Sequence, residues 1–146
     1  MLKVVTGIDD WVTEIIKDDP VRPNLSAEFR VNENAEIFTY WEETTLGAVC
    51  CVRYTEGIPE GINEMQKASS IDGDTAVFYT IWSYAKGSGR SLINEASKEI
   101  KARYPKIKNL VTLSPQTEMA EKFHLRNGAW KYRDNYDTVN FAYEID

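Results

Sequence analysis

Two apolar runs separated by a helical pattern constrain the fold of this chain more than any other feature. Residues 75–82 form a continuous apolar and β-branched run, typical of a strand buried on both faces. Residues 107–113 form a second such run. Between them, apolar residues recur at helical spacing until Pro105: Leu92, Ile93, Ala96, Ile100 and Tyr104. We therefore predict a βαβ unit with two parallel strands and a right-handed crossover.

The rest of the chain adds antiparallel strands and further helices. The patterns predict a helix over residues 11–16 that ends before Pro20, strands over 35–42 and 47–55 joined by a hairpin turn, a helical turn from Pro59 to Met65, a helix over 118–127 stopped by Gly128, and a last strand over 138–145. Residues 18–24, with two prolines, read as irregular. The predicted fold is α/β (α+β), one domain over residues 1–146, with a mixed sheet flanked by helices.

Charge and cysteine content narrow the class of partner. The net charge of −6 and the pI near 4.9 disfavour nucleic acid and anionic membranes as partners. No signal-like or 18-residue apolar segment is present, so we expect a cytoplasmic protein. Cys50 and Cys51 are neighbours in a predicted strand and should point to opposite faces as reduced core residues. With a single histidine besides, we expect no metal site.

A glycine-containing loop connects the first buried strand to the long helix. The sequence there is Tyr-Ala-Lys-Gly-Ser-Gly-Arg over residues 84–90. Backbone N–H groups at a helix N-terminus favour phosphate, and glycine allows the backbone to approach a ligand closely. The candidate ligand-binding residues are therefore Lys86, Gly87, Ser88, Gly89 and Arg90. An ordinary glycine turn that begins a helix explains the same pattern equally well.

Ser114 and His124 are the candidate catalytic residues. Ser114 ends the second buried strand, and ligands of open α/β sheets bind beyond the carboxyl ends of strands. His124 lies on the helix that follows and is the only histidine, the side chain best suited to proton exchange near neutral pH. We expect it at the margin of an apolar stripe formed by Met119, Ala120, Phe123 and Asn127. The alternative is that His124 is a boundary residue and Ser114 bonds nearby backbone. A Gly-x-Ser-x-Gly hydrolase motif is absent.

The element order and the glycine loop resemble the GNAT fold of acyl-CoA enzymes. That family binds the coenzyme A pyrophosphate at a loop of the type Gln/Arg-x-x-Gly-x-Gly/Ala, and Gly87 and Gly89 match its two small positions. Tyr84 replaces the usual Gln or Arg. His124 stands where many members have the tyrosine that protonates the departing thiolate. The resemblance implies an acyl-CoA ligand bound at this loop.

Five short runs resemble, in order, the GNAT-like catalytic domain of malonyl-CoA decarboxylases. They are VRYTEGIP (52–59), TAVFYTI (75–81), TLSP (112–115), FHLRNGA (123–129) and VNF (139–141). The resemblance implies that Ser114 and His124 form the catalytic pair. It also implies that backbone groups of Tyr79, Thr80 and Ile81 line the pantetheine and supply oxyanion donors. The implied substrate is a coenzyme A thioester, malonyl-CoA or acetyl-CoA, without a metal.

The chain also differs from those decarboxylases. We expect a minimal version without their preceding helical domain, and their insertion between the Leu-Ser-Pro and Phe-His-Leu runs is reduced to residues 116–122. Three functions follow as hypotheses. The first is a minimal decarboxylase that converts malonyl-CoA to acetyl-CoA, and the second is an N-acetyltransferase acting on an amine. The third is a non-catalytic GNAT-like module that binds a partner protein. The physiological substrate, the acceptor and homo-oligomerisation stay open.

Overall fold

A computed structural model describes residues 1–144 and confirms the α/β class with a mixed sheet flanked by helices. The elements are β1 (Leu2–Val5), α1 (Asp10–Ile15), the 3-10 helix η1 (Ile16–Asp18), α2 (Ala27–Arg30), β2 (Ala35–Glu42), β3 (Thr45–Thr55), α3 (Ile62–Lys67), β4 (Thr75–Ser83), α4 (Ser88–Arg103), β5 (Asn109–Thr112), β6 (Ser114–Pro115), α5 (Glu118–Arg126), β7 (Trp130–Asp134) and β8 (Thr138–Tyr143). No described helix is long and apolar enough to cross a membrane.

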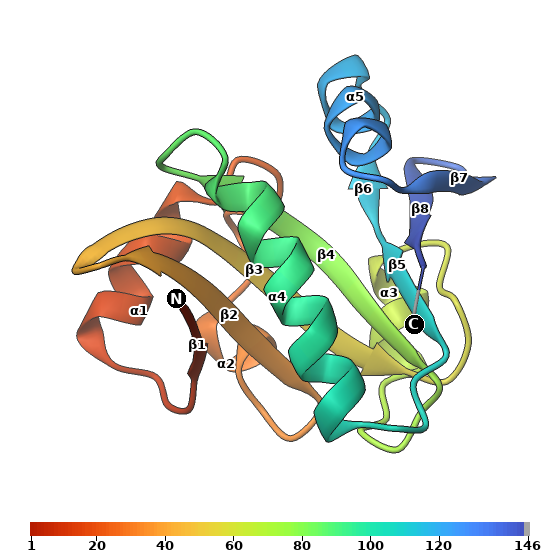
Figure 1. Ribbon diagram of the computed structural model, residues 1–146. Helices are drawn as coiled ribbons and strands as arrows, with labels where there is room; N and C mark the ends of the chain where they lie inside the picture. The colour runs from red at the N-terminus through yellow and green to blue at the C-terminus, as the bar shows by residue number, and fades with distance from the viewer. Residues whose placement is uncertain (145–146) are drawn as a thin grey trace.

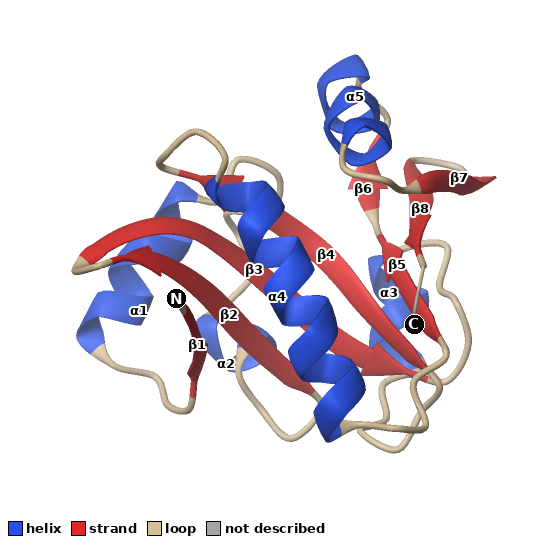
Figure 2. Cartoon of the chain, viewed as in Figure 1, coloured by secondary structure: helices blue, strands red, loops and turns tan. Residues whose placement is uncertain are grey.

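The sheet has eight strands in the order β1-β2-β3-β4-β5-β8-β6, and β7 pairs with β8 (Figure 2). Strands β4 and β5 are parallel and are joined through α4, which confirms the predicted βαβ unit. Strands β2 and β3 form the predicted antiparallel hairpin. The predicted end of the last strand, Ile145, lies outside the described residues.

Helices cover the two faces of the sheet unequally (Figure 1). Helix α4 packs on one face through Leu92, Ala96 and Ile100, whereas α1, α2 and α3 contribute apolar residues to the core on the opposite face. Cys50 belongs to the first core and Cys51 to the second, and both are free thiols. Their placement on opposite faces is the one expected for neighbours in a strand.

The parallel strands β4 and β5 separate halfway along β4. Their register runs from Thr75 opposite Asn109 to Phe78 opposite Thr112, and the N–H of Leu113 donates to the carbonyl of Phe78 at 3.1 Å. Beyond this point β4 continues beside β3, whereas the chain of β5 passes into β6, which pairs with β8. Figure 1 shows β4 running toward the loop before α4, whereas β5 and β6 lead toward α5. The divergence leaves one edge of β4 without a strand partner.

Several elements were not expected from the sequence. Strand β1 is only four residues long, and α2 is a single turn begun by the Ser26 hydroxyl, which accepts the Phe29 N–H at 3.1 Å. Strand β7 is mostly exposed and rich in charged residues, so it has no apolar alternation. The predicted strand over residues 107–113 is too long at both ends, because β5 covers only Asn109–Thr112 and a separate strand, β6, begins at Ser114.

Candidate functional site

A β-bulge in β4 lies where β4 and β5 separate. Thr80 pairs with Cys51 and Phe78 pairs with Val52, so Tyr79 is the extra residue on β4. Because of this bulge, the side chains of Tyr79 and Thr80 both lie on the face opposite α4. Ring contacts place Tyr79 in the core of that face, and the Thr80 hydroxyl donates to the Asp19 carboxylate at 2.8 Å.

The bulge also redirects the Tyr79 carbonyl away from the regular ladder. It accepts a hydrogen bond from the guanidinium of Arg22, which comes from the segment that reads as irregular in the sequence. Ile81 faces the core on the α4 side and is half-buried. Of the three residues expected to line a pantetheine chain, Tyr79 therefore has its carbonyl occupied by a side chain of the protein itself.

The glycine loop is held against the β2–β3 hairpin. The Gly47 carbonyl accepts the N–H groups of Tyr84 at 2.7 Å and Ala85 at 3.2 Å. Gly87 has φ of +85°, a left-handed conformation that favours glycine. Among the described residues, no acceptor is recorded for the N–H groups of Gly87, Gly89 and Arg90. These groups point out of the first turn of α4, where the helix dipole favours an anion.

The residues at the N-terminus of α4 differ in solvent exposure. Lys86 and Arg90 are exposed, and Ser88 and Gly89 are buried. A Cβ atom at Gly89 would lie 2.8 Å from Ser83 Oγ and 3.2 Å from Phe123 Cζ. Helix α5 therefore reaches across the divergence and lays Phe123 against the start of α4, which glycine alone permits.

Ser114 lies at an interruption in the ladder between β5 and β8. The Thr112 hydroxyl replaces a backbone group there and accepts the Phe141 N–H at 3.0 Å. The Nδ2 group of Asn140 donates to the Thr112 carbonyl at 2.8 Å. Ser114 is 5% exposed, and its Oγ donates to Thr112 Oγ1 at 2.8 Å. The hydroxyl proton of Ser114 is thus already used in a hydrogen bond to the last residue of β5.

His124 is the buried residue of α5, at 5% exposure. Its ring stacks on Phe141 with centroids 5.3 Å apart, and Nδ1 lies 2.6 Å from the hydroxyl of Tyr143. Burial lowers the pKa of the imidazole to about 4 and raises the pKa of the Tyr143 phenol. At neutral pH the ring is therefore uncharged and the phenol keeps its proton. We assign the phenol as donor to Nδ1, which places the ring proton on Nε2.

The Nε2 edge of His124 is available to a ligand. No hydrogen-bond partner for Nε2 is recorded in residues 1–144. Within the described residues, the side-chain atoms that are fully buried and lack a partner are Arg53 Nε and Tyr79 Oη, and His124 Nε2 is not among them. Nε2 is therefore not fully buried there, so its N–H can donate to a molecule that enters beside α5.

The structure brings Ser114 and His124 to one face of the sheet without joining them. Ser114 pairs with Val139 and His124 stacks on Phe141, and residues two apart on β8 point to the same side. No hydrogen bond between the two candidates is recorded in the described chain, because each has another partner. The expected stripe on α5 is wrong in one respect: Met119 is 83% exposed, and the buried face is centred on His124 instead.

A cavity of about 520 Å³ opens on the face opposite α4, beside Pro115 of β6 and Thr138 of β8. Arg22, Ile62, Pro115 and Thr138 line it from the N-terminal loop, the start of α3, β6 and β8. Pro115 directly follows Ser114, so the cavity adjoins one of the two candidate catalytic residues. Three exposed acids stand among its lining residues: Glu60, Glu64 and Asp137.

A buried ion pair anchors the loop that carries Arg22. The Arg30 guanidinium and the Asp19 carboxylate are both fully buried and lie 2.8 Å apart. Asp19 also accepts the N–H groups of Val21 at 2.8 Å and Arg22 at 2.9 Å. Burial raises the pKa of Asp19, but these hydrogen bonds outweigh it and hold that pKa below its usual value.

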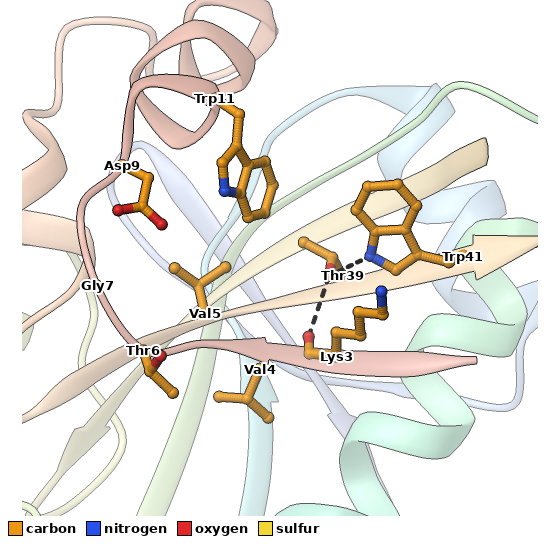
Figure 3. Close-up of a pocket in the computed structure, with 9 residues that line it drawn as sticks. All are labelled: Lys3, Val4, Val5, Thr6, Gly7, Asp9, Trp11, Thr39 and Trp41. Atoms are coloured by element: carbon orange, nitrogen blue, oxygen red, sulfur yellow. Dashed lines mark hydrogen bonds between the residues drawn. The ribbon is translucent and has the colours of Figure 1, made fainter. Parts of the chain in front are cut away.

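A second cavity, of about 400 Å³, lies at the far edge of the sheet on β1 (Figure 3). Trp11 and Trp41 form its aromatic wall in an edge-to-face arrangement with centroids 6.2 Å apart. Lys3 Nζ lies 5.0 Å from the Trp41 ring centroid. Three strands separate β1 from β5, so this cavity is independent of the divergence.

Comparisons with known proteins identify the fold as GNAT-like. The model superposes on malonyl-CoA decarboxylase from Agrobacterium vitis with a TM-score of 0.68 and 24% identity, covering 84% of this chain and 35% of that one. For the ribosomal-protein-S18-alanine N-acetyltransferase from Escherichia coli the TM-score is 0.65 at 15% identity, covering 100% and 95% of the two chains. For the GNAT-like decarboxylase GphF in complex with isobutyryl-CoA the TM-score is 0.58 at 13% identity, covering 75% and 78%.

No protein-family model matches the sequence, and no curated protein matches it significantly. The chain spans about a third of the length of the Agrobacterium decarboxylase. At these identities the similarity establishes the GNAT-like fold, which the sequence resemblance predicted.

Sequence reasoning missed the partners of the candidate residues. Thr112 and Tyr143 hold Ser114 and His124, and each lies in a segment whose alternation suggests only a core strand. Arg22 lies between two prolines, where no periodicity marks it. One signal in the sequence was the spacing of Thr112 and Ser114. Residues two positions apart in a strand lie on the same face, so the two hydroxyl groups could be expected to lie close together.

Proposed function

We propose that this chain binds an acyl-CoA between the diverging strands β4 and β5 and decarboxylates malonyl-CoA to acetyl-CoA. The observation that carries the proposal is the divergence itself, bordered at one end by the unpaired N–H groups of Gly87, Gly89 and Arg90. A pyrophosphate fits those groups, with the exposed Lys86 and Arg90 side chains adding charge. The pantetheine would follow the open edge of β4 toward Ser114 and His124.

Similar structures support an acyl-CoA ligand. GphF was solved with isobutyryl-CoA, and the PaiA N-acetyltransferase from Thermoplasma acidophilum was solved with coenzyme A. Three malonyl-CoA decarboxylases, GphF and several acetyltransferases share the fold, so both reaction types are represented. The TLSP and FHLRNGA runs occur in this chain in the same order as in the malonyl-CoA decarboxylases, which favours decarboxylation.

The chemistry requires a stabilised enolate and a proton. Loss of CO2 breaks the bond between the carboxylate carbon and the α-carbon, and the electron pair moves into the thioester carbonyl. The Nε2–H of neutral His124 and backbone N–H groups at the open edge of β4 would donate to that oxygen. His124 then protonates the α-carbon through Nε2, while the Tyr143 hydroxyl passes its proton to Nδ1, so the ring stays neutral. Solvent then reprotonates Nε2, and Nδ1 returns its proton to the Tyr143 oxygen, which restores the starting tautomer.

Ser114 has a supporting role in this proposal. Its hydroxyl proton is directed at Thr112, so its oxygen offers only lone pairs unless the hydroxyl rotates on substrate binding. A rotated hydroxyl would orient the substrate carboxylate by donating to it. The Ser114→Ala variant should therefore retain more activity than His124→Ala.

The acids at the rim of the 520 Å³ cavity favour a second candidate function. Glu60, Glu64 and Asp137 give its mouth a negative potential, which attracts a protonated amine. An N-acyltransferase would draw its acceptor there and use His124 to protonate the coenzyme A thiolate.

Incubation of the purified chain with malonyl-CoA, followed by mass spectrometry of the thioester, tests the proposal. Formation of acetyl-CoA without an added amine supports decarboxylation, and acetyl transfer only in the presence of an amine supports the acyltransferase. Turnover that persists in the Ser114→Ala, His124→Ala double variant would show that the site is elsewhere. If no acyl-CoA binds by calorimetry while the fold is intact, a non-catalytic module is favoured instead.

A further inference from the structure

We infer that Arg22 is a binding site for a substrate carboxylate, in the cavity on the face opposite α4. In assigning that carboxylate to the malonyl group, the inference rests on the proposed function. The recognition chemistry itself, one guanidinium with one carboxylate, rests on the geometry around Arg22.

The backbone of Arg22 is fixed before any ligand arrives. Asp19 accepts its N–H at 2.9 Å, and Asp19 in turn binds Arg30 and the Thr80 hydroxyl, each at 2.8 Å. The guanidinium donates to the Tyr79 carbonyl at the bulge of β4. A side chain held at both ends loses little conformational freedom on binding, so more of the interaction energy contributes to affinity.

The guanidinium of Arg22 forms no ion pair in the described part of the chain. Over residues 1–144 no carboxylate lies within 4 Å of its guanidinium, although the side chain is half-buried. Burial accordingly lowers the pKa of Arg22. A partly desolvated guanidinium with unused N–H donors gains most from a bidentate carboxylate, whose two oxygens match its planar fork.

The position of Arg22 fits the substrate carboxylate of the proposed reaction. Arg22 and Pro115 line the same cavity, and Pro115 is the neighbour of Ser114. A thioester lying along the open edge of β4 would thus have its carbonyl on the side of His124 and its carboxylate directed through the divergence toward Arg22. Acetyl-CoA has no carboxylate and would make no such contact.

The acids of the rim affect this site unequally. Glu60 lies 3.9 Å from the Arg133 guanidinium, and Glu64 accepts the N–H of Glu60 at 3.2 Å, so both carboxylates have partners. Asp137 interacts electrostatically with Arg22 and opposes a second anion there. Removing its charge should therefore strengthen carboxylate binding.

Calorimetry with malonyl-CoA and acetyl-CoA tests the inference, in a His124→Asn background that prevents consumption of malonyl-CoA. We expect Arg22→Gln to weaken the binding of malonyl-CoA about tenfold or more while leaving the binding of acetyl-CoA unchanged. Asp137→Asn should strengthen the binding of malonyl-CoA and leave the binding of acetyl-CoA unchanged. This second variant does not touch the contacts that hold the loop, so it gives a result even if Arg22→Gln unfolds. Equal effects on the two thioesters would overturn the inference.

Free malonate, titrated by NMR into the chain without further substitution, separates this site from the acyl-CoA proposal. Malonate that binds and is lost in Arg22→Gln supports the site even if neither thioester binds. Malonate that competes with malonyl-CoA assigns the carboxylate to the thioester, whereas malonate that binds together with malonyl-CoA assigns it to a separate small acid. If malonate fails to bind and malonyl-CoA is bound no better than acetyl-CoA, Arg22 is no carboxylate site, whatever the affinity for coenzyme A.

Discussion

The hydroxyl of Tyr143 lies 2.6 Å from Nδ1 of His124, in the buried layer between β8 and α5. This contact determines which proton His124 can offer. Because the ring is buried and neutral, it holds a single proton, and donation from the phenol places that proton on Nε2. The only histidine of the chain is thus a neutral donor whose Nε2 edge meets solvent.

Replacing Tyr143 by phenylalanine should reduce turnover of malonyl-CoA by about tenfold or more, because Nδ1 loses its proton source. Nitrogen NMR of the imidazole should show the tautomer mixture change. Tyr54→Phe is the matched control, since Tyr54 is also buried and its hydroxyl donates to Glu36 at 2.6 Å. Both variants should lose stability, but only Tyr143→Phe should lose activity. Equal activity in the two would contradict the role of Tyr143.

The lowered pKa of His124 predicts a loss of stability in acid. The unfolded chain binds a proton near the ordinary pKa of 6.5, whereas the folded ring binds it only near pH 4. The unfolded state therefore binds more protons between these values, and the contribution present above pH 6.5 falls by up to about 3 kcal/mol as the pH drops to 4. Urea unfolding at pH 7 and pH 4.5 measures the change in the free energy of unfolding. The decrease should be smaller in His124→Gln than in the unsubstituted protein. An equal decrease in the two would refute the lowered pKa of His124.

Gly89→Ala should displace helix α5 from the start of α4. The added Cβ would lie 2.8 Å from Ser83 Oγ and 3.2 Å from Phe123 Cζ, so one of these groups must move. We expect a loss of about 1–3 kcal/mol, the usual effect of overpacking, together with weaker coenzyme A binding. Gly7→Ala is the control, because no atom lies within 4 Å of its added Cβ. Thermal unfolding and calorimetry should distinguish the two variants.

Asp19→Asn should destabilise the protein by about 3–5 kcal/mol, because it leaves the charge of Arg30 buried without a counter-charge. It should also release the loop that carries Arg22. Glu14→Gln breaks an exposed ion pair with Lys17 of similar length, 3.0 Å, and should have little effect. Urea midpoints of the two variants give the comparison. A small effect of Asp19→Asn would mean that the buried pair contributes little to the stability of the loop.

Strong periodicity made parts of the fold predictable. Strand β2 was predicted with its observed bounds, Ala35–Glu42, and the βαβ unit formed by β4, α4 and β5 was predicted as parallel. Short or polar elements could not be predicted in this way. Strand β1 has too few residues for a hydrophobic period, and β7 alternates charged and aromatic side chains that are mostly exposed.

The sequence by itself determined the order of the main elements, the opposite faces of Cys50 and Cys51, and the candidate status of Ser114 and His124. Only the tertiary structure decided what those side chains contact. Ser114 bonds Thr112, His124 bonds Tyr143, and Arg22 reaches the bulge at Tyr79 from a loop 57 positions earlier. Periodicity reports which face of an element is buried, whereas hydrogen-bond partners and charge pairing depend on where distant segments meet in space.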